Sequence, residues 1–95
     1  MSTEKITREL RLQNKYGMHV RPAGLFAKCA CRFDADVAVE KDGNVVSGKS
    51  IMALMTLEAV CGTVLRVTAS GPQAAEVLDE LEALVGRKFD IPDEQ

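Results

Sequence analysis

The chain has no tryptophan, only four aromatic residues and a single histidine among its 95 residues. With so few aromatic rings, aliphatic side chains must fill the core of the one small domain that this length allows. The chain has a net charge of -2 and so lacks the excess of basic residues that is typical of nucleic-acid-binding proteins. No apolar run approaches the roughly 18 residues needed to cross a bilayer. We therefore expect a single cytoplasmic domain with no nucleic-acid ligand and no membrane insertion.

Cysteine is also scarce, and its spacing argues against a metal or redox site. Cys29, Cys31 and Cys61 cannot all pair with one another within one chain. Cys29 and Cys31 are separated by one residue, which is not a zinc or redox spacing, and on a helix they would point in different directions. We interpret all three as free thiols in a reducing compartment, and we expect neither a metal nor another cofactor.

Apolar residues in the first third of the chain follow a strand period and then a helix period. A period of two predicts a strand over residues 5–12, although Arg8 interrupts its apolar face. Spacings of three and four predict an amphipathic helix that begins at residue 20 or 22 and ends near residue 32. Its apolar positions are Pro22, Phe26, Cys29 and Phe33.

The middle of the chain predicts a hairpin followed by a short helix. β-Prone residues at 35–40 and 45–46 flank Asp42-Gly43, and an Asp-Gly pair in that place is a strong hairpin signal. Ser50 then precedes a run of helix formers, as is typical of a helix N-cap. We expect this helix to end at Cys61-Gly62.

The last third predicts one more strand and a longer helix. Residues 63–70 alternate in the strand manner, and Ser70 with Gln73 three positions later resembles a capping box. Gly86 is expected to end the helix. The apolar face of that helix is formed by Ala74, Val77, Leu78, Leu81, Leu84 and Val85.

The resulting element order is β-α-β-β-α-β-α. This order is typical of an α+β open-faced β-sandwich, in which helices cover one face of a four-stranded antiparallel sheet. The single domain spans residues 1–95, with a core at about residues 5–88 and an acidic tail at residues 89–95. Phe89 is expected to fold back on the core.

Residues 16–23 combine several groups that suit phosphate chemistry. His19 carries a nucleophilic imidazole that changes charge near neutral pH. Arg21 offers a planar fork of donors that matches a phosphate, and Pro22 suits the first turn of a helix. Free backbone N–H groups and the helix dipole favour an anion at such a helix start. The stretch predicts a phosphohistidine site, and it is also compatible with a plain helix cap beside an ordinary surface charge.

The short helix after Ser50 is apolar almost all round. Its residues cannot all share one buried face, so we expect part of its apolar surface to stay exposed. Met52 and Met55 lie one turn apart and would form an adaptable patch of the kind used at binding surfaces. The alternative interpretation is that these methionines fill an irregular core.

Two separate motifs carry a resemblance to a known family. Residues 17–23 (GMHVRPA) are similar to the active-site motif, and residues 49–57 (KSIMALMTL) to the regulatory serine motif, of the histidine-containing phosphocarrier HPr family. These proteins serve the bacterial phosphoenolpyruvate:sugar phosphotransferase system. The resemblance runs from about Ile6 to Gly86, which is nearly the whole chain.

The resemblance implies roles for individual residues. His19 would accept a phosphoryl group on Nδ1 from enzyme I, which uses phosphoenolpyruvate, and would pass it to an enzyme IIA domain. Arg21 would stabilise the phosphate, and Pro22 would shape the helix start. Ser50 would be the target of an HPr kinase/phosphorylase, with a transcriptional regulator as a further partner. The implied partner surface comprises Lys28, Lys49, Ile51, Met52 and Met55.

The chain departs from the family pattern at two positions. Val20 stands where alanine is common, which adds bulk beside His19. Ala53 stands where glycine is common, a change that favours helix. Neither change removes a chemical group that phosphotransfer needs.

The leading hypothesis is a monomeric phosphoryl relay for sugar uptake and not a turnover enzyme, because no second acid, base or metal cluster accompanies His19. The first alternative is a regulatory binding module controlled by phosphorylation of Ser50. The second is a phosphocarrier of a nitrogen-related branch without sugar transport. The pair of His19 and Arg21 favours the relay, and the Ser50 motif leans against the nitrogen branch.

Overall fold

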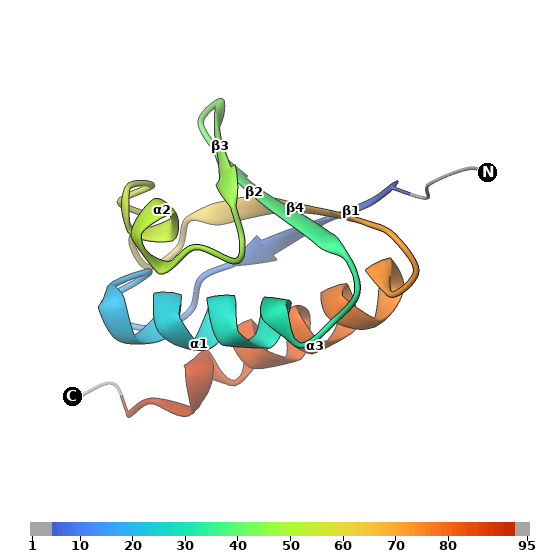
Figure 1. Cartoon of the computed structure of the whole chain (residues 1–95). Helices are drawn as coiled ribbons and strands as arrows, with labels where there is room; N and C mark the ends of the chain where they lie inside the picture. Colours follow the sequence, from blue (N-terminus) through green and yellow to red (C-terminus); the bar gives the residue numbers. More distant parts are fainter. Residues whose placement is uncertain (1–4, 93–95) are drawn as a thin grey trace.

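The computed structural model describes residues 5–92 and shows one sheet with its helices gathered on one side (Figure 1). The predicted element order is confirmed. In chain order the elements are β1 (Lys5–Arg11), α1 (Val20–Cys31), β2 (Asp36–Lys41), β3 (Asn44–Ser47), α2 (Ile51–Met55), β4 (Val64–Ser70), α3 (Ala74–Gly86) and the short 3₁₀ turn η1 (Lys88–Asp90).

The four strands form one antiparallel sheet in the order β1-β4-β2-β3. β4 therefore lies inside the sheet, and its Ser70 is opposite Lys5 of β1 and Asp36 of β2. Asp42 and Gly43 connect β2 to β3 with φ values of 52° and 84°. Two left-handed residues in a two-residue connection suit the twist of a hairpin, so the predicted hairpin is confirmed.

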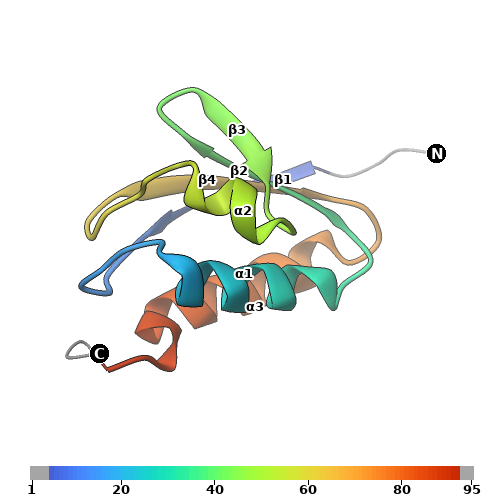
Figure 2. The same cartoon turned by 60° about the vertical axis from the view of Figure 1, so that its left-hand side comes forward.

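The helices cover one face of this sheet. α1 and α3 lie side by side beneath the strands, and α2 sits at the end of the sheet beside β3 and above α1 (Figures 1 and 2). All six predicted apolar positions of α3 are buried. The largest completely buried side chains are mostly aliphatic: Phe26, Phe89, Leu12, Leu54, Leu65, Leu78, Leu81, Val39, Val67 and Val77. Among residues 5–92, no helix has both the length and the apolar character that crossing a bilayer requires.

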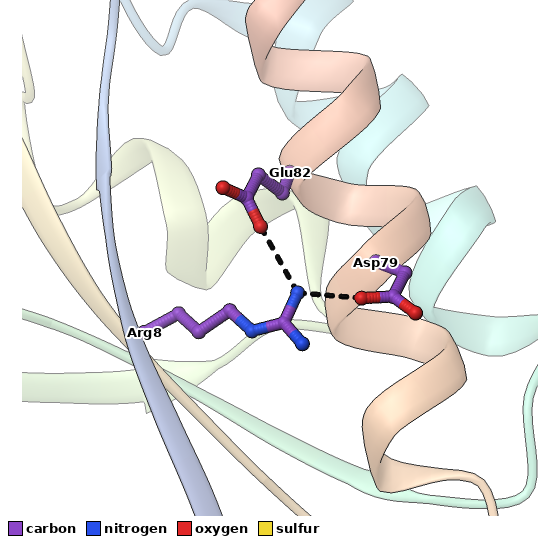
Figure 3. A network of polar contacts seen from close by, with 3 residues as sticks. All are labelled: Arg8, Asp79 and Glu82. Atoms are coloured by element: carbon purple, nitrogen blue, oxygen red, sulfur yellow. Dashed lines mark hydrogen bonds and ion pairs between the residues drawn. The ribbon is translucent and has the colours of Figure 1, made fainter.

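Arg8 occupies the helix-facing side of β1, where it interrupts the apolar pattern. Its Nη1 donates to Asp79 Oδ1 at 2.7 Å and to Glu82 Oε1 at 3.0 Å, both on α3 (Figure 3). The hydrogen bond with Asp79 is the main reason why the pKa of Arg8 lies above its ordinary value. The interruption is therefore a charged link between the first strand and the last helix.

α2 is shorter than predicted. It ends at Met55 and not at Cys61-Gly62. Glu58 has a φ of 51°, and this left-handed turn leads the chain away from the helix. The carbonyl oxygen of Ala59 can then accept the Met18 N–H at 2.8 Å. The chain that follows α2 is therefore tied to the loop before α1.

The predicted capping box before α3 is wrong. Ser70 is the last residue of β4, and Gln73 itself is the N-cap of α3 without a side-chain capping bond. Gln73 Oε1 instead accepts the backbone N–H of Asp34 at 2.7 Å. The glutamine thus ties the start of α3 to the connection between α1 and β2.

α3 ends at Gly86 as predicted, but without the left-handed glycine cap that was expected. Gly86 is the last helical residue, but it does not adopt the left-handed conformation of a glycine cap. Lys88, Phe89 and Asp90 take that conformation instead, with φ values of 55°, 59° and 57°. Phe89 is only 1% exposed, so it packs on the core as expected and belongs to the core and not to the tail. The final three residues of the predicted tail lie outside the described residues.

Candidate functional site

His19 follows a short loop whose backbone forms hydrogen bonds within the loop and with the connection between α2 and β4. The N–H of Gly17 donates to the carbonyl of Asn14 at 3.2 Å, and the His19 N–H donates to the carbonyl of Gly17 at 3.0 Å. Between them, Met18 donates its N–H to Ala59. These bonds pair the backbone N–H groups of the three residues that lead into α1, Gly17, Met18 and His19.

Gly17 is required at its position for two reasons. Its φ of 66° is a conformation that side-chain-bearing residues rarely adopt. A Cβ atom at this place would clash with the Ala59 carbonyl oxygen and would lie 2.8 Å from Val60 Cα. The absence of a side chain lets the loop lie directly against residues 59–60. This close contact fixes the position of the loop from which α1 begins.

His19 is the N-cap residue of α1, with φ -87° and ψ -171°, and its side chain makes no capping hydrogen bond. Its carbonyl accepts the Ala23 N–H at 2.9 Å, the first bond of the helix. The N–H groups of Val20 and Arg21 precede that bond, and Pro22 has none. The imidazole is thus free of a capping role and stands beside two helix-start donors that suit an anion.

The surroundings of the imidazole are partly aromatic and open to solvent. His19 is half-buried, and the Tyr16 ring meets it edge-on at 6.1 Å between centroids. Val20 is 60% exposed, so its extra bulk faces the solvent beside His19. Arg21 is exposed on the first turn of α1, and Pro22 is buried in the same turn, as predicted. The arrangement leaves the imidazole accessible to a macromolecular donor.

Ser50 is the N-cap of α2, as predicted. Its Oγ accepts the Ala53 N–H at 3.1 Å. Met52 is 81% exposed and Met55 is 40% exposed, whereas Leu54 is completely buried. The exposed methionines contradict the alternative in which they fill the core. The apolar surface of α2 is therefore presented to solvent, next to a hydroxyl group that also serves as a helix cap.

The predicted partner residues lie on two neighbouring helices. A Cβ on Gly24 of α1 would be 3.8 Å from Ile51 Cδ1, so α2 packs closely against this turn of α1. Exposed Lys28 lies one turn further along the same helix face. Exposed Lys49 immediately precedes the α2 cap. The structure thus places Lys28 and the exposed apolar side chains on two helices that contact each other, with Lys49 just before the second helix.

One residue that sequence reasoning missed is Asn14. It is 5% exposed, and its Nδ2 donates to the Gly17 carbonyl at 2.7 Å. The available signal was an asparagine in a short loop that contains a glycine, because asparagine side chains often bond to nearby backbone groups in turns. Its neighbours in the sequence, Gln13 and Lys15, are polar, so nothing beside it marks Asn14 as a buried residue.

The cysteines are free thiols, as expected. Cys29 is buried, and Cys31 and Cys61 are exposed. Burial raises the pKa of the Cys29 thiol, which keeps it in the neutral form. Cys29 and Cys31 do point in different directions on α1.

A family model described as "PTS HPr component phosphorylation site" matches residues 6–87. The chain belongs to the HPr family. It is 42% identical over 78 residues to the phosphocarrier protein HPr of Vibrio cholerae, covering 82% of this chain and 92% of that protein. It is 41% identical over 80 residues to the HPr-like protein Crh of Bacillus subtilis, covering 84% and 94%. The crystal structure of HPr from Bacillus anthracis matches with a TM-score of 0.80 at 39% identity, covering 83% and 94%.

Membership of the HPr family confirms the resemblance drawn from the two motifs. The family is that of the phosphocarriers of the bacterial phosphotransferase system, and the relatives include proteins named HPr, NPr and Crh. The open-faced sandwich is also the fold of the HPr structures that the chain matches.

Proposed function

We propose that this HPr-family chain is a phosphoryl relay. His19 accepts a phosphoryl group from phospho-enzyme I, charged from phosphoenolpyruvate, and passes it to an enzyme IIA domain during sugar uptake. The observation that carries this proposal is the placement of the imidazole: half-exposed, without a capping bond, and at the N-terminus of α1. The chain carries the phosphoryl group and does not turn over a substrate of its own.

The chemistry is a displacement at phosphorus. The lone pair of His19 Nδ1 forms a P–N bond while the bond between phosphorus and the donor breaks, and the donor keeps that electron pair. The phosphoryl oxygens then face the N–H groups of Val20 and Arg21 and come within reach of the Arg21 guanidinium. Because the site is solvent-exposed, these donors stabilise the anion without burying it, and the group remains transferable.

The surface across α1 and α2 is the proposed docking site for enzyme I and for IIA domains. It combines exposed apolar side chains with two lysines: Ile51, Met52, Met55, Lys28 and Lys49. Apolar anchors supply most of the affinity in such an interface, and charged rims mainly guide orientation and association rate. We further propose that the chain is a monomer in the cytoplasm, where its exposed free thiols fit a reducing compartment.

A second candidate function is a regulatory binding module controlled at Ser50. The specific observation in its favour is that the Ser50 hydroxyl caps α2 next to Met52, the most exposed of the methionines described above. A phosphate added by an HPr kinase/phosphorylase would place charge beside that apolar surface and would alter docking of a transcriptional regulator. Service in a nitrogen-related branch is a variant of the relay that differs only in the partners.

The test is phosphorylation with phosphoenolpyruvate and enzyme I, read by intact mass at neutral or alkaline pH. We expect one added phosphoryl group on the wild-type chain, lost in acid and absent from His19→Ala. The fold should survive this substitution, because the side chain is half-exposed and caps nothing.

Ser50→Ala is the matched control, and it should take the label as the wild type does. An acid-labile label that persists in His19→Ala would refute the assignment of the acceptor. No label on the wild-type chain with its cognate enzyme I would shift the function to the Ser50-controlled module.

A further inference from the structure

Asn14 differs from every other buried residue in the described part of the chain because its side chain is polar. Its Nδ2 donates to the Gly17 carbonyl at 2.7 Å. The other end of the amide, Oδ1, is buried and has no hydrogen-bond partner among residues 5–92. Only the donor half of this side chain is therefore used within the fold.

The carbonyl that Asn14 contacts is the one that supports His19. The Gly17 oxygen accepts the Asn14 amide on one side and the His19 N–H, at 3.0 Å, on the other. The Gly17 N–H in turn donates to the Asn14 carbonyl at 3.2 Å. Asn14 thus bonds to both the N–H and the carbonyl of Gly17, the residue two positions before His19.

Stability alone gives little reason for this asparagine. A buried acceptor without a partner costs more free energy than a neutral hydrogen bond gains. A small apolar residue at position 14 would avoid that cost. What the amide does supply is a fixed orientation for the peptide group after Gly17, a residue with the greatest backbone freedom of all.

We propose that Asn14 is a positioning residue for phosphoryl acceptance, an inference that rests on the relay function proposed above. Its amide fixes the Gly17 carbonyl, which fixes the His19 backbone and so the direction in which the imidazole meets the donor phosphorus. Asn14 takes no proton and touches no reacting atom. Its contribution lies in the alignment of nucleophile and phosphorus, on which displacement rates depend steeply.

Two variants separate the hydrogen-bond donor of the Asn14 side chain from its shape. Asn14→Ala removes the amide, and Asn14→Asp keeps the shape but at pH 8 turns a carboxylate oxygen toward the Gly17 carbonyl. Gln13→Ala is the matched control, because Gln13 is the exposed neighbour in the same loop.

Initial rates of phosphoryl acceptance are measured against chain concentration, below the unfolding temperature of each variant. We expect kcat to fall on the order of tenfold in both Asn14 variants. KM should stay within about twofold, because the docking surface on α1 and α2 is unchanged. Gln13→Ala should keep both constants. Wild-type kcat in Asn14→Ala, or in Asn14→Asp if the alanine variant does not fold, overturns the proposal, as does an effect confined to KM.

Hydrogen exchange of the His19 amide gives a readout that does not need phosphotransfer. This amide is bonded to the Gly17 carbonyl, so it should exchange faster in both Asn14 variants and at the wild-type rate in Gln13→Ala. If the wild-type chain accepts no phosphoryl group, the relay function and the role of Asn14 in phosphoryl acceptance fail together, and the exchange rate still tests the structural step, in which Asn14 fixes the backbone of Gly17 and His19. Unchanged exchange in the variants then overturns it.

Discussion

At the scale of single residues, the geometry of the site depends on neighbours that take no part in the chemistry. His19 is the proposed nucleophile, but Gly17 allows the loop to lie against Ala59, and Asn14 bonds to the Gly17 carbonyl. Each acts on the backbone and not on the imidazole. Substitutions at these neighbours should therefore alter function without removing any reacting group.

Gly17→Ala should be strongly destabilising. The left-handed backbone costs a side-chain-bearing residue about 1–2 kcal/mol. The clash with the Ala59 carbonyl adds about 1–3 kcal/mol of overpacking. Gly62→Ala is the control, because Gly62 also has a positive φ but a Cβ there would meet no atom within 4 Å. Urea unfolding should show a clearly larger loss for Gly17→Ala, and equal losses would show that the close approach to Ala59 is unimportant.

The residue scale also shows what a linear pattern can predict. His19, Arg21 and Pro22 could be proposed as site residues because their side-chain chemistry is visible in the sequence. Asn14 was missed because its burial follows from packing that the loop composition does not reveal. Arg8 was noticed as an interruption, but its carboxylate partners lie on α3, far along the chain. Chemistry can be predicted from residue type, whereas partners require the fold.

At the scale of elements, α2 is the segment that depends most on local support. A five-residue helix is not stable in isolation, so it depends on the Ser50 cap and on the buried Leu54. The same cap residue is the proposed phosphorylation site. A change at Ser50 can therefore act through the helix or through charge, and the two effects need separate variants.

Ser50→Asp and Ser50→Asn separate these effects, because both side chains can cap α2 and only the first carries charge. We expect Ser50→Asp to weaken binding to enzyme I, measured by calorimetry, and Ser50→Asn to bind as the wild type does. Ser50→Ala should lose about 1 kcal/mol of capping stability and speed hydrogen exchange at Ala53, which donates to the Ser50 hydroxyl. Equal affinities for Asp and Asn would mean that Ser50 is only a cap.

The elements with a clear period were predicted well, and their ends were not. Hydrophobic spacing located α1, α3 and the strands, and Asp42-Gly43 located the hairpin, because these signals are local. α2 stops early, and the chain after it pairs Ala59 with Met18 of a distant loop. α3 lacks the expected capping box, and Gln73 bonds instead to Asp34. Strand order was likewise outside the reach of alternation, which assigns faces and not neighbours.

At the scale of the whole molecule, both the first strand and the segment after the last helix contribute to the core. β1, the first strand, pairs with β4, and the segment after α3 places Phe89 in the core. Phe89 reaches the core from a run of three left-handed residues, each at a cost of about 1–2 kcal/mol. Burial of the ring is the largest apolar gain in this segment, and the Arg87–Asp90 ion pair and the packing of Ile91 against the core add to it. Phe89 thus folds back on the core as expected, although the predicted boundary at residue 88 placed it in the tail.

Phe89→Ala should therefore destabilise the whole domain and not only its end. Truncating a buried phenylalanine costs about 3–5 kcal/mol, and we expect the lower end because the left-handed turn can relax once the ring is gone. Phe33→Ala is the control, since Phe33 is only half-buried and should cost less. The measurement is urea unfolding of both variants, monitored by the circular dichroism of the backbone. A loss for Phe89→Ala no larger than that for Phe33→Ala would show that the chain after Gly86 is dispensable, and the core would then end with α3.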